Sequence, residues 1–210
     1  MKNKLIILAG MPGAGKGDNS EHLGRRPNTV SVSTGELFRA LDPAGELGMR
    51  VASIINTGGL VSDDIVNQMV AEKLVPGGDI VLDGYPRSIP QAEWLLGHAA
   101  GMPFEIIAIL LEIDEKIAEQ RRDSRIAKAL ANGETPRKDD ADSSALSRRF
   151  AEYYEKTAPM VKFLRQKLGD NFYNVDASVS VEEVYAAVEN IVSGEIKTAR
   201  PDKSQEPPRQ

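Results

Sequence analysis

Short apolar runs alternate with segments of helical periodicity along most of the 210-residue chain. The runs are rich in branched residues, which is typical of strands buried on both faces of a sheet. Strands are predicted at Leu5–Ala9, Thr29–Val32, Asp79–Leu82, Ile106–Glu112 and Phe172–Val175. Because helical patterns separate these strands, the sequence predicts a three-layer α/β fold with a five-stranded parallel sheet.

The chain has more residues than a minimal crossover fold needs in two places. A small helical insertion is predicted within residues 34–75, and a second, turn-rich insertion around residues 131–136. A long helical pattern over residues 142–168 is expected to be interrupted near its single proline. The polar segment 195–210 is expected to be a disordered tail, which leaves one domain over residues 1–194.

Two helix starts carry the capping-box pattern, in which a serine and a glutamate three residues later satisfy free backbone N–H groups. The pairs are Ser33 with Glu36 and Ser180 with Glu183. We expect a capping box at both places.

Composition and charge exclude several classes of protein. No apolar run approaches the length of a bilayer span, and the first run is too short for a signal peptide. The chain has no cysteine, which excludes disulfides and thiolate zinc sites. The net charge of −5 argues against a general nucleic-acid binder, so any polyanion site must be a local basic cleft. We expect a cytoplasmic enzyme without a nucleic-acid or membrane partner.

The first predicted strand leads directly into a glycine-rich loop, Gly10–Lys16, with the pattern G-x-x-x-x-G-K. Glycines let backbone N–H groups wrap phosphate oxygens, and Lys16 would reach the β- and γ-phosphates. Gly17 occupies the place where such loops usually carry a hydroxyl. Asp18 adds an acid beside a site for polyanions. At about 5 Å from a phosphate this acid would cost about 3 kcal/mol at an effective dielectric near 20, unless it turns into solvent.

A second motif begins with Asp83, which directly follows the third predicted strand. An acid at the carboxyl end of a strand beside a phosphate loop can hold Mg²⁺, directly or through water. Arginines suited to phosphate oxygens lie further along the chain. Arg121 and Arg125 share a helix face by their spacing of four, and the pair of Arg122 and Arg125 is nearly as well placed.

Five stretches together match the motifs of one known family. They are Gly10–Gly17, Ser33–Arg39, Gly59–Asp63, Asp83–Ala92 and Arg137–Asp140. The chain resembles the adenylate kinases, which are nucleoside monophosphate kinases, over about residues 4 to 193. Glycine after the lysine is usual in that family, whereas threonine is usual at the position of Asp18.

The resemblance implies the role of each site residue. Its ATP-binding positions fall on Gly13, Ala14, Gly15, Lys16, Gly17, Asp18 and Arg121. Its AMP-binding positions fall on Thr34, Arg39, Ile55, Val61, Gly84, Arg87 and Gln91. The groups around the transferred phosphoryl are Lys16, Arg87, Arg125, Arg137 and Arg149, and the Mg²⁺ residue is Asp83, acting through water.

The resemblance also assigns the insertions. Residues 33–62 become a monophosphate-binding insertion and residues 126–137 a short lid, which without cysteine cannot be of the zinc-bearing kind. The sequence from Arg149 to Tyr153 matches the family's pattern, which favours Arg149 as a site arginine. The spacing from Arg137 would instead favour Arg148.

The expected activity is reversible phosphoryl transfer from ATP·Mg²⁺ to AMP, giving two ADP, by a monomer. A kinase for another nucleoside monophosphate is one alternative, although Thr34 and Gln91 speak against UMP and CMP. Asp18 leaves open a catalytically weakened, nucleotide-binding homologue.

Overall fold

The computed structural model describes residues 2–42, 44–56, 61–135 and 143–196. Its centre is a five-stranded parallel sheet in the order β2-β3-β1-β4-β5. The strands are β1 (Asn3–Ala9), β2 (Thr29–Ser33), β3 (Asp79–Asp83), β4 (Phe104–Glu112) and β5 (Phe172–Asp176). All five predicted strands are confirmed, and the predicted α/β class with them.

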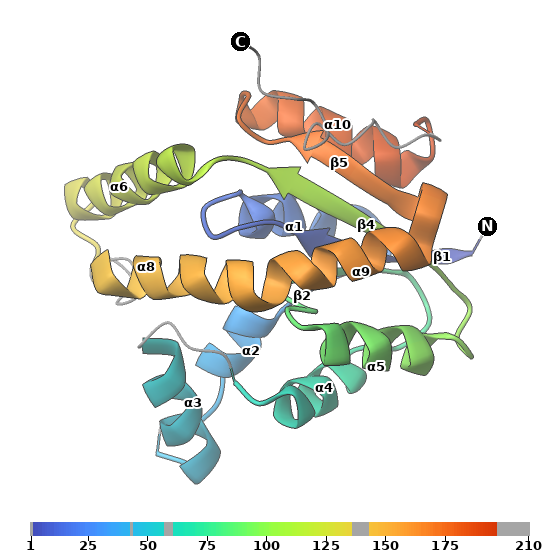
Figure 1. Ribbon diagram of the computed structural model, residues 1–210, viewed down its shortest axis with the longest axis horizontal. Coiled ribbons are helices and arrows are strands. Elements are labelled where there is room, and N and C mark those ends of the chain that lie inside the picture. The colour runs from blue at the N-terminus through green and yellow to red at the C-terminus, as the bar shows by residue number, and fades with distance from the viewer. Residues whose placement is uncertain (1, 43, 57–60, 136–142, 197–210) are drawn as a thin grey trace.

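Helices connect the strands and cover both faces of the sheet (Figure 1). They are α1 (Lys16–Gly24), α2 (Thr34–Arg39), α3 (Glu46–Asn56), α4 (Asp63–Ala71), α5 (Ile89–Ala99), α6 (Glu115–Ala131), α8 (Ser143–Glu152), α9 (Ala158–Leu168) and α10 (Val181–Ser193). The interruption expected near Pro159 is a π-helix, Tyr153–Thr157, which joins α8 to α9. A short 3₁₀ turn, Gly169–Asn171, leads into β5. No helix within the described ranges is long and apolar enough to cross a membrane.

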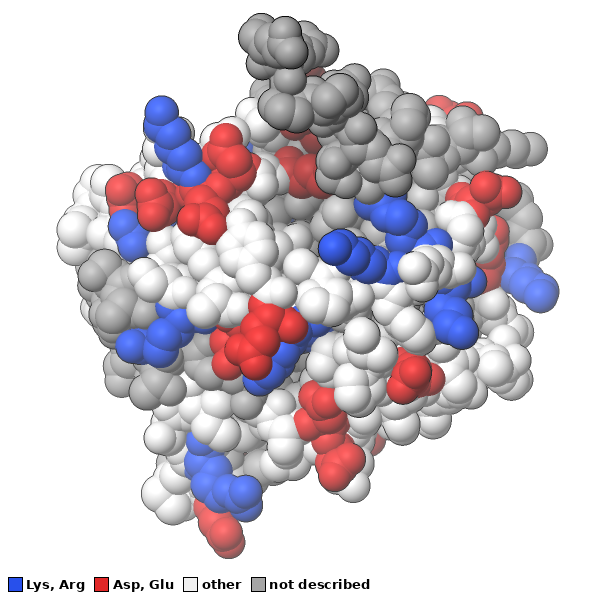
Figure 2. All heavy atoms as spheres, in the orientation of Figure 1, with Lys and Arg blue, Asp and Glu red and all other residues white. Residues whose placement is uncertain are grey.

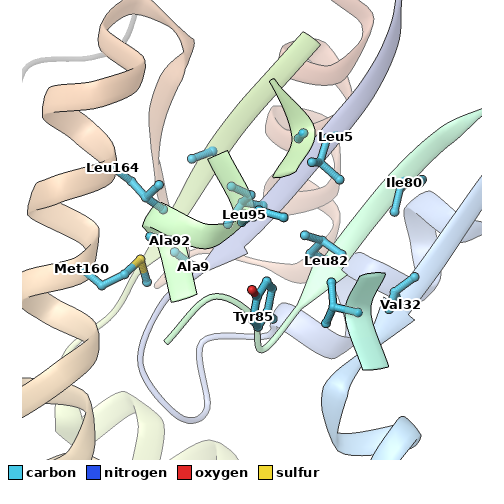
Figure 3. Close-up of a cluster of buried hydrophobic side chains, with 14 of the residues drawn as sticks. Leu5, Ala9, Val32, Ile80, Leu82, Tyr85, Ala92, Leu95, Met160 and Leu164 are labelled. Atoms are coloured by element: carbon cyan, nitrogen blue, oxygen red, sulfur yellow. The ribbon is translucent and has the colours of Figure 1, made fainter. Parts of the chain in front are cut away.

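The strands contribute alternate side chains to two separate cores. Leu5 and Ile7 of β1 join the core under α4, α5 and α9, part of which is drawn in Figure 3. Ile6 and Leu8 belong to the opposite core, under α1 and α10. Successive side chains of a strand point to opposite faces, so a strand covered on both sides must be apolar throughout. This double burial explains the unbroken apolar runs in the sequence.

Of the two expected capping boxes, only the second is present. The Ser180 hydroxyl accepts from the backbone N–H of Glu183, whose carboxylate receives the Ser180 N–H in return. The Ser33 side chain makes no capping bond to α2. It donates instead to Asp83 Oδ2 at 3.3 Å, because the parallel register of β2 and β3 places these residues side by side. The prediction of a capping box at Ser33 was therefore wrong.

Candidate active site

The glycine-rich loop leaves the carboxyl end of β1 and opens directly into α1. Gly15, at the N-cap of that helix, has φ +88°, a left-handed conformation that favours glycine. Lys16 Nζ donates to the carbonyls of Gly10 and Met11 at 2.7 and 2.9 Å. The lysine is thus folded back over the loop that it follows, and its ammonium group rests on two carbonyls of that loop.

Several cations share this region, and the ionisation of Lys16 responds to them. Burial, which disfavours the charged form, lowers the pKa of Lys16 to about 8. The negative charge of Asp83 opposes that shift, while the positive charges of Arg87 and Arg149 add to it. The cluster has more positive than negative charge at its centre and so favours a bound polyanion.

Asp83 ends β3 at the same edge of the sheet. Its register partners are Leu8 of β1 and Ser33 of β2, so the acid lies between the glycine-rich loop and the start of α2. A Cβ added to Gly17 would lie 3.7 Å from Asp83 Oδ2, so this carboxylate faces the first turn of α1. A hard oxygen donor beside a phosphate loop is suited to Mg²⁺.

Arg87 follows Asp83 after a tight turn. Its Nε donates to the carbonyl of Gly84 at 2.8 Å, and burial and the nearby charge of Arg149 lower the pKa of its guanidinium. Gly84 has φ +75°, and a Cβ there would lie 2.8 Å from the Arg87 guanidinium and 2.9 Å from Thr34 Oγ1. Only glycine leaves room for both side chains. Thr34 Oγ1 in turn donates to the Gly84 carbonyl at 3.1 Å.

Gln91 lies in the first turn of α5 and is buried, although its amide is polar. Its Oε1 accepts from the backbone N–H of Arg87 at 2.7 Å. Its Nε2 donates to Asp63 Oδ1 at 2.7 Å, across to the first turn of α4. Burial with a partner at each end gives the amide a fixed place in the cleft wall.

The helix α6 presents Arg121 and Arg125 to the cleft. Arg121 Nη2 donates to the carbonyl of Ala177 at 2.6 Å, and Nη1 contacts that of Gly13 at 3.4 Å. Arg122 instead pairs with Asp123. Of the two pairs that the spacing allowed, Arg121 and Arg125 are therefore the pair on the face of α6 that lines the cleft.

The two neighbouring arginines of α8 are separated by the structure. Arg149 is half-buried and lines the cleft, and its charge acts on Lys16 and Arg87. Arg148 is exposed. The geometry favours Arg149 as the site arginine.

One continuous cleft of about 1480 Å³ gathers most of the candidate residues. It is larger than the roughly 300–1,000 Å³ of a pocket for one small ligand. Its walls include Gly13, Ala14, Gly15, Lys16, Gly17, Asp18, Thr34, Arg39, Val61, Asp83, Gly84, Arg87, Gln91, Arg121, Arg125 and Arg149. Arg137 and the side chain of Ile55 lie outside the part of the chain that the structure describes. The face of the molecule shown in Figure 2 carries acidic and basic side chains intermixed.

Asp18 lies on the exposed side of the first turn of α1, at the margin of the cleft. Burial raises the pKa of Tyr185, on α10, and the charge of Asp18 raises it further. The carboxylate is thus close enough to α10 to act on it through solvent.

Sequence reasoning missed three residues that support the site. Ser33 contacts Asp83, Asp63 contacts Gln91, and Thr157 Oγ1 donates to the Arg87 carbonyl at 3.1 Å. The partners are 28 to 70 positions apart in the chain. No local pattern could have paired them, because only the packing of separate elements brings them together.

Comparison with known proteins agrees with this geometry. The profile described as adenylate kinase matches residues 8–168. The chain belongs to the adenylate kinase family. An adenylate kinase of Agrobacterium fabrum is 36% identical over 192 residues, which is 89% of this chain and 96% of that protein. Adenylate kinases of Brucella melitensis biotype 1 and Brucella ovis are also 36% identical, over 89% of this chain and 97% of theirs. The adenylate kinase family binds ATP and AMP and uses ATP with Mg²⁺.

Proposed function

We propose that this protein is itself an adenylate kinase, which transfers the γ-phosphoryl group of ATP·Mg²⁺ to AMP and forms two ADP. The observation that carries the proposal is the single cleft, which brings a phosphate loop together with a half-buried arginine, Arg87, and a buried glutamine, Gln91. Its volume of about 1480 Å³ leaves room for two nucleotides.

ATP is assigned to the end of the cleft formed by the glycine-rich loop. Backbone N–H groups from Gly13 to Gly17 and the start of α1 would hold its phosphates. Lys16 would turn from the Gly10 and Met11 carbonyls to the phosphates. Arg121, which lies against the Gly13 carbonyl, would border the adenine.

AMP is assigned to the wall formed by α2, α4 and the start of α5. Arg39 and Arg87 would hold its phosphate, since guanidinium groups pair well with phosphate oxygens. Thr34 and Val61 line the same wall, and Gln91 would bind the adenine edge. Ile55 and Arg137 keep the roles that the family resemblance implies.

No protein base is required, because the AMP phosphate is already ionised at neutral pH. The work of the protein is then to place the two phosphates in line and to neutralise the charge that moves between them. Lys16, Arg87, Arg125 and Arg149 supply that positive charge from four different elements. Asp83 would hold the Mg²⁺ ion through water, and the ion supplies further charge neutralisation when bound.

Closure of the cleft would bring these groups together and exclude water. Residues 33–62 are proposed as the monophosphate-binding insertion and residues 126–137 as a short lid without zinc. The described part of that lid is the end of α6 and the turn after it. A cytoplasmic monomer is the proposed state.

A coupled assay of ADP formation tests the proposal. The protein is supplied with ATP and Mg²⁺ and, in turn, with AMP, GMP, CMP and UMP. ADP formed with AMP, at a kcat/KM well above that with the other three, is the expected result. Faster turnover with another monophosphate would favour the alternative kinase, and ATP binding without turnover would favour a weakened homologue that results from Asp18.

A further inference from the structure

Asp63 is half-buried at the start of α4 and receives a side-chain hydrogen bond on each carboxylate oxygen. Gln91 Nε2 donates to Oδ1 at 2.7 Å, and Ser88 Oγ donates to Oδ2 at 2.9 Å. Both donors come from the start of α5, where Ser88 is the N-cap. The carboxylate therefore joins the first turns of two helices in the wall of the cleft.

These contacts fix which way round the Gln91 amide lies. A carboxylate only accepts hydrogen bonds, so Asp63 must face the NH₂ group of the amide. The backbone N–H of Arg87 only donates, so it must face Oε1, as observed at 2.7 Å. The two partners demand the same orientation, and the reversed amide would place like groups together at both ends.

Each end of the amide retains one unused hydrogen-bonding position. Oε1 has a second lone pair, and Nε2 has a second N–H. A 6-aminopurine offers a donor at N6 and an acceptor at N1, which complement this pair. A 6-oxopurine offers an acceptor at O6 and a donor at N1, and would require the amide to turn over.

We propose that Asp63 is a positioning residue that sets the choice between purine monophosphates. It holds Gln91 in the orientation that accepts AMP and rejects IMP and GMP. This inference rests on the proposed function, since it places the base of AMP against Gln91. Asp63 does not touch the base and acts only through the amide.

The substitution Asp63→Asn tests the inference, because an asparagine of the same shape can either accept from Nε2 or donate to Oε1. The orientation of the Gln91 amide is then fixed only by the backbone N–H of Arg87. We expect the ratio of kcat/KM for AMP to that for IMP to fall about tenfold, which corresponds to about 1.4 kcal/mol. The KM for AMP should rise, and the KM for ATP should stay as in the wild type.

Asp64→Asn is the matched control. Asp64 is exposed in the same first turn of α4, so both variants remove one acid from the same helix start. The control should keep the wild-type ratio. A ratio measured on one preparation does not depend on the folded fraction, so a loss of stability in Asp63→Asn cannot imitate the effect.

Ser88→Ala provides a second test, because it removes one bond to Asp63, together with the N-cap bond to the backbone N–H of Gln91, and leaves the side-chain bond between Asp63 and Gln91 in place. Its AMP-to-IMP ratio should fall less than that of Asp63→Asn. If the wild type turns over AMP normally and the ratio in Asp63→Asn is unchanged, the inference about Asp63 is overturned and the proposed function stands. Absence of ADP formation from AMP in the wild type would overturn the proposed function and, with it, the basis of the inference.

Discussion

The two halves of the cleft satisfy their polar groups in different ways. In the half formed by α2, α4 and α5, side chains bind one another or nearby backbone: Thr34 and Arg87 bind Gly84, and Gln91 binds Asp63. In the half formed by the glycine-rich loop, α6 and α8, cations lie close together. Lys16 there rests on two backbone carbonyls and has a pKa lowered to about 8.

In one half of the cleft hydrogen bonds fix the positions of the side chains, whereas the other half is characterised by its positive charge. Hydrogen bonds in which at most one partner is charged fix the geometry of the first half before a ligand arrives. Burial, together with the charges of Arg87 and Arg149, lowers the affinity of Lys16 for its proton, so the free protein carries an electrostatic cost there. A triphosphate would relieve that cost on binding. The ligand thus completes a site that the fold leaves electrostatically unbalanced.

The largest effect is expected from Arg87→Ala, at the boundary between the halves. Its guanidinium contacts the Gly84 carbonyl and is sensitive to the charge of Arg149. Loss of one such charged contact should lower kcat by about 10²–10³-fold while the fold stays intact. A coupled assay of ADP formation measures kcat, and circular dichroism checks that the fold is intact. Wild-type turnover in this variant would contradict the assignment of Arg87.

The neighbouring arginines of α8 give a matched pair for the cation-rich half. Arg149→Ala should lower kcat about 10²-fold, because Arg149 lines the cleft and acts on Lys16 and Arg87. Arg148→Ala removes the same charge from an exposed position and should stay within about twofold of the wild type. The reverse pattern would assign the role to Arg148 instead.

Lys16→Met should stabilise the unliganded protein although it removes turnover. The folded-state pKa of about 8 lies below the ordinary value of 10.5, so the folded state holds this proton less tightly than the unfolded state. The resulting cost, about 3 kcal/mol, is fully present below pH 8 and disappears as the pH rises toward 10.5. Against this, the substitution removes the hydrogen bonds from Lys16 to the Gly10 and Met11 carbonyls, which lowers the free energy of unfolding by about 1–2 kcal/mol.

The net gain in the free energy of unfolding at pH 7 should therefore be about 1–2 kcal/mol. Urea unfolding at pH 7 and at pH 10 measures it, and the gain should vanish at the higher pH. Lys4→Met is the control: Lys4 also binds a carbonyl, that of Val192, but lies outside the cleft and should lose stability. A loss of stability in Lys16→Met would show that the cationic half carries no such cost.

The smallest effect is expected from Asp18→Thr. Because Asp18 is exposed, a water-like dielectric near 80 applies, and the repulsion from a phosphate at about 5 Å falls to about 0.8 kcal/mol. ATP affinity, measured by calorimetry, should rise about two- to fourfold, and the gain should shrink with added salt. No gain would mean that Asp18 does not affect ATP binding. A hundredfold gain would mean that it faces the phosphates directly.

Local features were predictable because they arise from neighbouring residues. The apolar runs marked all five strands, since strands buried on both faces admit few polar residues. The glycine-rich loop was identifiable because its backbone conformation requires glycine at Gly15. The capping box at Ser180 is present as expected. Ser33 instead donates its hydroxyl to Asp83, a residue 50 positions away in the chain.

The sequence by itself determined the parallel α/β fold, the phosphate loop and the family, because these follow from short patterns that nearby residues enforce. Only the tertiary structure decided that Arg149 rather than Arg148 lines the cleft, that Asp18 is exposed at the cleft margin and that Asp63 holds Gln91. These outcomes depend on which helix faces meet across the sheet. A charge or an amide acquires its role from partners that chain spacing does not specify.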